Sequence, residues 1–168
     1  MASQASFDVS TGADLQEVDN AVNQARKEIT QRFDFKGARA AEIELDRAKG
    51  ELRLHADDEF KMKALADVLY AKLAKRGVPL RNLTAGAPES SGNDTVRRTD
   101  MLTQKIESEI ARDIVKRVKA QAFKKVQVAI QGDELRVSAP SKDTLQEVIA
   151  FLRGEDFGIE LKFGNYRS

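Results

Sequence analysis

The chain repeats one order of secondary-structure elements twice, and this repeat constrains the fold more than any single motif. ELRLHA at Glu51–Ala56 and ELRVSA at Glu134–Ala139 are nearly the same sequence in equivalent places. In each half, apolar residues alternate as in strands or recur at three and four as in helices, in the order strand, helix, hairpin, helix, strand. This βαββαβ order favours an α+β fold of two tandem ferredoxin-like domains. Each domain is a four-stranded antiparallel sheet with two helices on one face.

Capping residues and turns locate the elements within each half. Asp14 precedes a helix whose apolar positions run from Leu15 to Phe33, and Asp58 lies at the start of a second helix. In the second half, Ser141 begins the last helix and Gly154 ends it. Strands are expected over 6–10, 41–46, 51–56, 80–84, 94–102, 124–132, 133–139 and 159–163.

The segment AGAPESSGND at 85–94 consists of small and turn-forming residues, and it predicts a flexible linker. The first domain then covers residues 1–90 and the second covers residues 91–168. An exchange of the first strands between the two halves is the alternative, and it would make one domain discontinuous.

Composition excludes several classes of protein. The 168 residues carry a formal net charge of +1, so no overall electric field attracts nucleic acid or a membrane surface. There is no Cys, which fits a reducing compartment, and no apolar run approaches the length of a membrane span. We therefore expect a cytoplasmic protein that does not enter membranes. Only 6% of the residues are aromatic, so the positions of the eight Phe are informative.

The segment QRFDFKG places two of these Phe between two cations, where the first helix runs out. In a structural interpretation, Phe33 completes the apolar stripe of the helix, Phe35 seals the corner before the next strand, and Arg32 and Lys36 neutralise the helix C-terminus. In a functional interpretation, an aromatic ring beside two cations binds a base by stacking and its phosphate by charge.

Two further segments offer polar or charged side chains to a ligand. In IQGDEL, Gln131 and Asp133 can bind a guanine edge, although a tight turn with Gly132 at positive φ explains the same residues. Arg97 and Arg98 can clamp a phosphate or simply increase solubility. The third helix and the turn after it carry cations that either follow a nucleic-acid backbone or form a solvated face. These cations are Arg112, Lys116, Arg117, Lys119, Lys124 and Lys125.

The sequence offers no catalytic set, metal site or cofactor motif. His55 is the single histidine, so neither a zinc site nor a Ser-His-Asp or Cys-His arrangement can be assembled around it. Neither a GxxxxGK[ST] loop nor a GxGxxG turn occurs. The outward positions of the two hairpins, Arg53, His55, Arg136 and Ser138, include no aromatic residue, so base stacking by the sheets is not expected. The pattern indicates a binding protein, not an enzyme, and no cofactor.

Three long segments resemble one known family. SFDVSTGADLQEVDNAVNQARKEITQRFDFKG, KKVQVAIQGDELRV and LQEVIAFLRGEDFGIELKFGNYR together are similar to the YajQ family over essentially the whole chain. The resemblance implies a small bacterial cytoplasmic protein with two split-βαβ domains that binds a nucleotide without enzymatic activity. Some members of the family are cyclic di-GMP receptors that regulate transcription through a protein partner.

The resemblance extends functional interest to the residues that match the most recognisable family stretches. The matching positions are Ser6, Phe7, Asp8, Arg32, Phe33, Asp34, Phe35, Gln131, Gly132 and Asp133. The chain departs from the family at Lys105, where the family usually has glycine. If that glycine lets a phosphate approach the backbone, the lysine would weaken or rearrange the contact.

Three functions remain open. The first is a receptor for a guanine nucleotide or cyclic dinucleotide, held by Arg32, Phe35 and Lys36 with Phe7 and Asp8, that signals to a transcriptional regulator. The second is an RNA-binding module that uses the open sheet faces and the basic helix, with Lys116 and Lys119 on the phosphates. The third is a scaffold whose sheets associate with copies of themselves.

Overall fold

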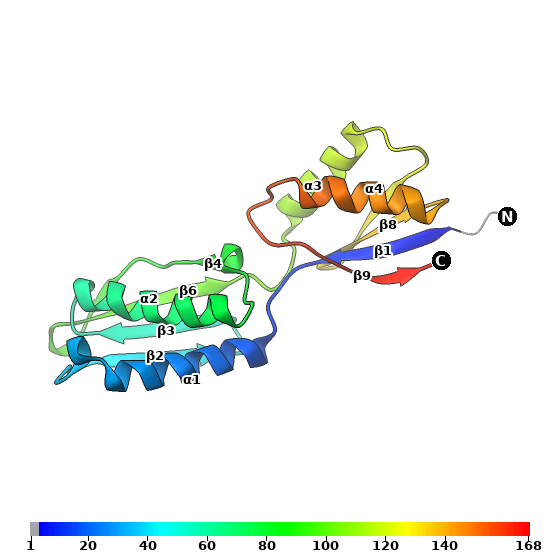
Figure 1. Cartoon of the computed structure of the whole chain (residues 1–168). Helices are drawn as coiled ribbons and strands as arrows, with labels where there is room; N and C mark the ends of the chain where they lie inside the picture. Colours follow the sequence, from blue (N-terminus) through cyan, green and yellow to red (C-terminus); the bar gives the residue numbers. More distant parts are fainter. Residues whose placement is uncertain (1–3) are drawn as a thin grey trace. The chain divides into compact units, whose positions relative to one another are not determined.

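The chain forms two compact units in a computed structural model that describes residues 4–168. One unit is the continuous segment Ala13–Thr103, here called the 13–103 unit. The other, here called the composite unit, combines the described residues up to Gly12 with Gln104–Ser168. In each unit, two helices cover one face of an antiparallel sheet (Figure 1). The fold class expected from the repeat, two tandem ferredoxin-like domains, is confirmed.

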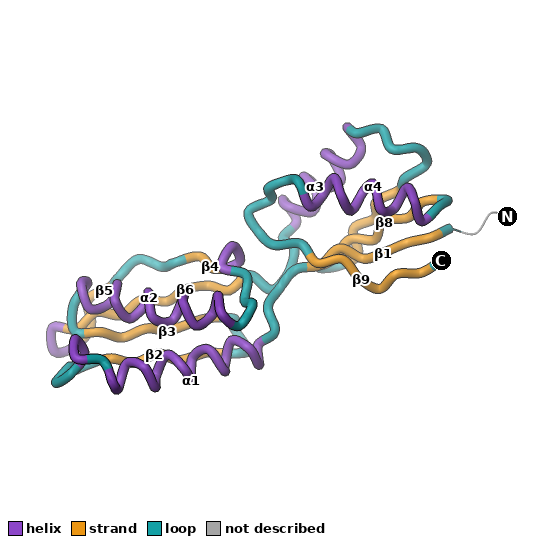
Figure 2. The backbone as a smooth tube through the Cα atoms, in the orientation of Figure 1, coloured by secondary structure: helices purple, strands orange, loops and turns teal. Residues whose placement is uncertain are grey.

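The sheet of the 13–103 unit has the strand order β2-β3-β6-β4, with β5 paired to another part of β6 (Figure 2). The central strand β6 is antiparallel to β3 and to β4. The elements of this unit are α1 (Leu15–Gln31), η1 (Phe33–Phe35), β2 (Ala41–Asp46), β3 (Glu51–Ala56), α2 (Glu59–Lys75), η2 (Leu80–Asn82), β4 (Leu83–Thr84), β5 (Glu89–Ser91), η3 (Gly92–Asp94) and β6 (Thr95–Leu102).

The composite unit has the equivalent strand order β7-β8-β1-β9. Strand β1 comes from the beginning of the chain, yet it lies between β8 and β9 and pairs with both. The elements of this unit are β1 (Ala5–Ser10), α3 (Ser108–Ala120), β7 (Gln127–Gln131), β8 (Glu134–Ala139), α4 (Lys142–Arg153) and β9 (Lys162–Arg167).

Each sheet thus receives the strand that opens the other half of the sequence. β1 pairs with strands of the second half, and β6 pairs with β3 of the first half. The boundary expected between residues 90 and 91 lies inside the 13–103 unit. The expected linker at 85–94 also belongs to this unit, where β5 pairs with β6. The linker prediction was wrong because a short edge strand of Glu and Ser looks like a loop in sequence.

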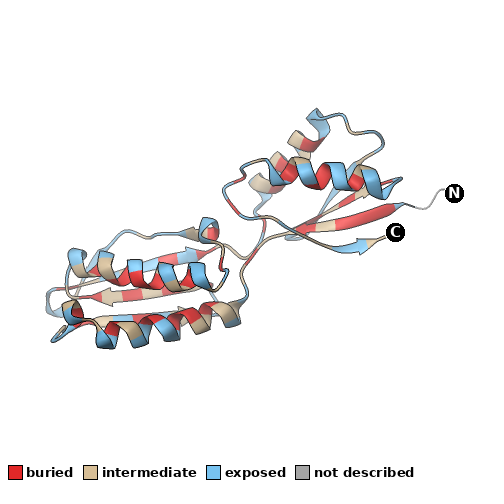
Figure 3. Ribbon diagram, in the orientation of Figure 1, coloured by how far each residue is buried: buried red, intermediate tan, exposed pale blue. Residues whose placement is uncertain are grey.

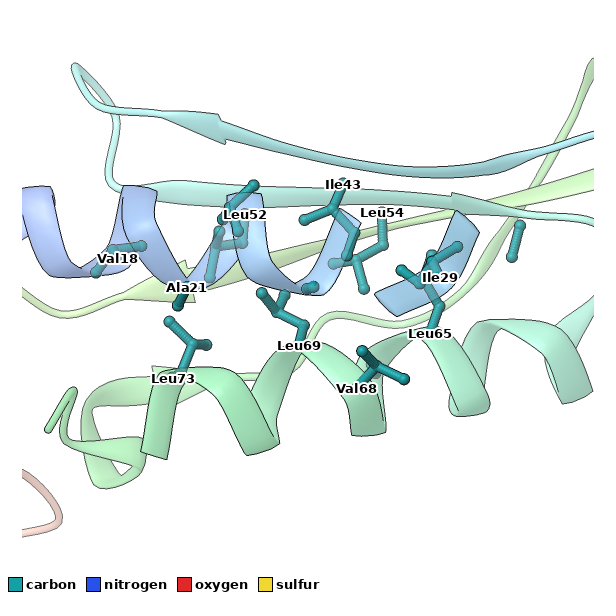
Figure 4. Packing of buried hydrophobic residues seen from close by; sticks show 14 of the residues in the cluster. Val18, Ala21, Ile29, Ile43, Leu52, Leu54, Leu65, Val68, Leu69 and Leu73 are labelled. Atoms are coloured by element: carbon teal, nitrogen blue, oxygen red, sulfur yellow. The ribbon is translucent and has the colours of Figure 1, made fainter. Parts of the chain in front are cut away.

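Burial follows the alternation that the sequence predicts. In β3, the side chains of Leu52, Leu54 and Ala56 are buried, and the residues between them are half-exposed on the open face of the sheet (Figure 3). Figure 4 shows Leu52 and Leu54 pointing toward residues of α1 and α2, among them Ala21 and Leu69. Each helix therefore packs one apolar stripe on one sheet face, and no element of residues 4–168 covers the opposite face of either sheet.

Helix starts match the capping residues, while two strand predictions need correction. The side chains of Asp14, Asp58 and Ser141 accept hydrogen bonds from backbone N–H groups in the first turns of α1, α2 and α4. The last strand runs over 162–167 instead of 159–163, because Ile159 packs in the core before the strand begins. Residues 80–82 form a 3₁₀ turn, so β4 retains only two residues. Among residues 4–168, no helix is long and apolar enough to span a bilayer.

Candidate functional site

Strand β1 places Phe7 and Asp8 on opposite faces of the composite unit's sheet. Phe7 is fully buried, and its ring packs edge-on against Phe163 with 5.9 Å between ring centroids. The role in ligand binding that the family resemblance implied for Phe7 is therefore wrong, because its ring is part of the core. Asp8 lies on the open face, where a ligand can reach its surroundings.

Asp8 is held by three side chains from neighbouring strands. Its carboxylate accepts hydrogen bonds from Nε of Arg136 at 3.1 Å, from Nδ2 of Asn165 at 2.7 Å and from a terminal nitrogen of Arg167 at 3.2 Å. Burial alone would raise the pKa of Asp8, but these hydrogen bonds outweigh it and lower the pKa to about 2. One carboxylate thus fixes two guanidinium groups, and the cluster keeps a positive charge that favours anions.

The lowered pKa of Asp8 predicts a loss of stability in acid. Because the folded-state value lies below the ordinary value of 3.8, the contribution is complete above about pH 5 and is lost as the pH falls toward 2. We expect the charged carboxylate of Asp8 to contribute about 2 kcal/mol to the free energy of unfolding. Urea unfolding at pH 6 and pH 2 measures it as the difference between wild type and Asp8→Asn. Identical pH profiles for the two proteins would show that the cluster does not stabilise the charged carboxylate.

A pocket of about 570 Å³ lies along β7, at the edge of the same sheet. Its volume is within the range of small-molecule sites. The end of α3 and the turn after it contribute one part of the lining, and β7 and β8 contribute the rest. This pocket, here called the β7 pocket, includes Lys119, Phe123, Gln127, Gln131, Arg136 and Ser138 in its lining.

The β7 pocket combines the groups that a nucleotide requires. Phe123 is half-buried against Phe151 and offers an apolar ring. Gln127 and Gln131 are four residues apart on one strand, so both amides lie on the same sheet face. Lys119 provides an ammonium group, and Arg136 joins the pocket to Asp8. Two of the residues predicted from sequence, Lys119 and Gln131, thus line the same pocket. A third, Asp8, lies next to the pocket through its hydrogen bond with Arg136.

The turn after β7 brings two further predicted residues close to Gln131. Gly132 has φ of 63°, which confirms the tight turn expected there. The backbone N–H of Ile106 donates to the carbonyl of Asp133 at 3.1 Å, so the neighbouring Lys105 lies beside this turn. Lys105 is exposed, and the residue at which the sequence departs from the pattern of the YajQ family therefore places a cation next to Gln131 and Asp133.

The QRFDFKG segment does not have the arrangement expected from the helical spacing. α1 ends at Gln31, and Arg32 has an extended backbone with φ of −82° and ψ of 135°. The following 3₁₀ turn exposes Phe33 at 87% and buries Phe35 at 6%. The prediction that Phe33 completes the apolar stripe was therefore wrong. The hypothesis that Phe35 stacks on a base is wrong as well, because its ring lies in the core beneath the guanidinium of Arg32, 5.7 Å away.

Exposed rings and cations remain at this end of the 13–103 unit. Phe60, at the start of α2, is 78% exposed, which makes it comparable to Phe33. Nζ of Lys61 donates to the carbonyl of Asp34, so the segments that carry the two rings are in contact. Arg32 pairs with Asp34 at 2.8 Å, while Lys36 is exposed. We call Phe33, Phe60, Arg32, Lys36 and Lys61 the aromatic corner.

The remaining predicted cations differ in their availability to a ligand. Arg98 is not free to clamp a phosphate, because it makes two hydrogen bonds of 2.7 Å to the buried carboxylate of Asp100. Arg97 is exposed on the opposite face and donates to Oγ of Ser91. On α3, Arg117 pairs with Asp113, whereas Lys116 and Lys119 are exposed. Only some of the cations of α3 are therefore available to bind the phosphates of a ligand.

Sequence reasoning missed Phe123, Phe60, Asn165 and Arg167. Phe123 follows the last turn of α3 in a segment without periodicity, so its position beside β7 had no local signal. Asn165 and Arg167 reach Asp8 only because β1 pairs with β9, far away in sequence. His55 bonds with Thr95, and in the part of the chain that the structure describes no group of three acidic, His or Cys side chains forms a metal site.

Comparison with known proteins supports the resemblance noted in the sequence. A family model described as nucleotide-binding protein YajQ-like matches residues 5–167. A protein of Koribacter versatilis, named a nucleotide-binding protein, is 49% identical over 97% of each chain. One of Heliobacterium modesticaldum with the same name is 49% identical over the full length of both chains. One of Carboxydothermus hydrogenoformans is 48% identical over 99% of this chain and 100% of its own. The chain belongs to the family of YajQ-like nucleotide-binding proteins.

Proposed function

We propose that this protein binds a guanine nucleotide or a cyclic dinucleotide in the β7 pocket and does not transform it. The observation that carries the proposal is the joint lining of one pocket by Lys119, Phe123, Gln131 and Arg136. The printed names of the relatives, which describe nucleotide-binding proteins, support the same class of ligand.

Each part of such a ligand has a chemical counterpart in or beside the pocket. The ring of Phe123 offers apolar contact to a purine. The carboxylate of Asp133 can accept hydrogen bonds from N1 and N2 of a guanine, and the amide group of Gln131 can donate to its O6. Lys119 and Arg136 supply positive charge to phosphate, and Arg136 is oriented for this by Asp8.

The position of the pocket also suggests how binding is communicated. Its lining comes from an edge strand and from the end of α3, and both elements are exposed to a protein partner. A regulatory protein, such as a transcriptional regulator, that contacts β7 or the turn after α3 would detect the bound ligand directly. This relay does not require the segment 85–94 as a hinge, since that segment belongs to the 13–103 unit.

Calorimetric titration with cyclic di-GMP, GTP, ATP and a short RNA tests the proposal with two matched lysine variants. Lys119→Ala removes a cation that lines the pocket, and Lys116→Ala removes another exposed cation of α3 that does not line it. We expect Lys119→Ala to lower the affinity for the preferred nucleotide by about tenfold or more, as for the loss of a charge-assisted hydrogen bond. Lys116→Ala is expected to bind within about twofold of wild type.

Two results would contradict the proposal. One is the absence of nucleotide binding at concentrations below about 1 mM. The other is equal binding by Lys119→Ala and wild type.

RNA binding is the second candidate, and the exposure of Phe33 and Phe60 favours it. Exposed aromatic rings beside cations can stack the bases of a single strand. In the same titration, RNA binding at the aromatic corner would be weakened by Phe33→Ala and unaffected by Lys119→Ala. Binding of RNA along the basic helix would instead be weakened similarly by both lysine variants, with a reduced dependence on salt.

A further inference from the structure

Strand β7 is an edge strand without the features that usually prevent edge-to-edge pairing. In the described residues it pairs only with β8. Its sequence QVAIQ contains no charge, no proline and no bulge, and Ile130 is 48% exposed. Natural edge strands are commonly blocked by Lys, by Pro, by bulges or by covering groups, because a free edge can pair with another chain.

The other edges of the two sheets do carry such features. On β2, the carbonyl of Ile43 accepts hydrogen bonds from Nε and a terminal nitrogen of Arg26. This side chain therefore satisfies a backbone acceptor at the edge of the sheet. β9 has a register shift in its pairing with β1 and a positive φ of 54° at Asn165. β4 and β5 are only two and three residues long. β7 therefore differs from the other edges in remaining open to pairing.

The sequence around β7 is complementary to itself in one antiparallel register. When Ala129 lies opposite Ala129 of a second copy, Gln127 faces Gln131, and Val128 faces Ile130. The apolar side chains then meet each other, and so do the amides. Lys125 and Asp133 lie in the turns on either side of β7, and this register brings the two turns of opposite copies together at each end of the paired strands, so opposite charges meet there.

Backbone geometry is compatible with the same register. Gln131 and Glu134 close the two-residue turn and form a hydrogen-bonded pair. Such pairs alternate along an antiparallel ladder, so Ala129 and Gln127 are also hydrogen-bonded to β8. The N–H and C=O groups of Val128 and Ile130 consequently face away from β8. These two residues are the ones that lie opposite each other when the register is centred on Ala129.

We propose that β7 is an interaction surface for a second copy of this chain. The two β7 strands pair antiparallel about a twofold axis at Ala129, and the two four-stranded sheets become one continuous sheet. Because a five-residue strand buries little surface, the dimer dissociates on dilution. Val128 and Ala129 also line the β7 pocket, so strand pairing covers part of that lining, and the proposal is tested on ligand-free protein.

Sedimentation equilibrium of the full chain at concentrations up to about 1 mM measures the association. Ile130→Lys places a charge on the proposed interface without altering the lining of the β7 pocket. Met101→Lys is the matched control, because Met101 is 44% exposed on the sheet of the 13–103 unit. We expect wild type and Met101→Lys to dimerise alike, and Ile130→Lys to associate at least about tenfold more weakly.

Charge reversal tests the register itself. Lys125→Asp or Asp133→Lys alone brings like charges together in the turns at both ends of the paired strands, and each is expected to weaken association by about tenfold. The double variant is expected to restore it. Asp suits position 125, where φ is 56°. A wild type that stays monomeric up to about 1 mM would overturn the proposal. Failure of the double variant to recover would do the same, as would equal weakening by Met101→Lys and Ile130→Lys.

Discussion

A fragment of residues 13–103 is expected to fold on its own, whereas a fragment of residues 1–90 is expected to remain unfolded. The first fragment contains every strand of its sheet and all the residues of its hydrophobic core. The second ends before β6, which lies in the centre of that sheet and pairs with β3 along six residues. It also retains β1, whose partners β8 and β9 are missing.

The physical reason is that loss of a central strand cannot be repaired locally. Without β6, one side of β3 loses its backbone partners, and Leu102 is lost from the core. Circular dichroism and heteronuclear NMR spectra distinguish the outcomes, because only a folded fragment gives dispersed amide signals and a cooperative thermal transition. A cooperative transition in 1–90 together with its absence in 13–103 would show that the folding units follow the halves of the sequence.

Replacement of Asp100 by alanine is expected to cost about 3–5 kcal/mol of unfolding free energy. Asp100 is fully buried between the sheet and α2, where it accepts hydrogen bonds from Arg98, from the hydroxyl of Tyr70 at 2.5 Å and from the N–H of Gly86 at 3.0 Å. Burial alone would raise the pKa of Asp100, but these hydrogen bonds keep it below the ordinary value. Burial, followed by the bond to Asp100, raises the pKa of Tyr70 to about 12.

The cost arises because Asp100→Ala leaves the guanidinium of Arg98, only 13% exposed, without its counter-charge. Urea denaturation near neutral pH measures it. Asp46→Ala is the matched control, since Asp46 pairs with Arg53 at 2.7 Å on the open face of the same sheet. We expect this control to lose much less stability than Asp100→Ala. Similar losses in the two variants would contradict a special role for the buried carboxylate.

The elements were predictable from sequence because their signals are local. The spacing of Met62, Leu65, Leu69 and Leu73 identifies the buried face of α2, and all four side chains are buried. Both hairpins follow from alternation and turn residues, and the structure pairs β2 with β3 and β7 with β8. The sharing of strands between the sheets has no local signal, because β1 and β6 satisfy the same pattern in either sheet.

The candidate site was less predictable, because single backbone torsions and distant pairings determine it. The extended conformation of Arg32 ends α1 before Phe33. As a result Phe33 is exposed to solvent and Phe35 is buried. Periodicity cannot reveal such a change. Lys119 and Gln131 were recognised by residue type and Asp8 by the family resemblance, but Phe123 completes the β7 pocket only through the packing after α3.

The β7 pocket as the nucleotide site is the central claim, and an NMR titration tests it most directly. Backbone amide shifts of the full chain are followed as cyclic di-GMP, or whichever nucleotide binds best by calorimetry, is added. The account predicts that the largest shift changes cluster within 118–138, which includes the lining of the β7 pocket. Changes confined to residues 32–36 and 60–63, with 118–138 unaffected, would contradict it.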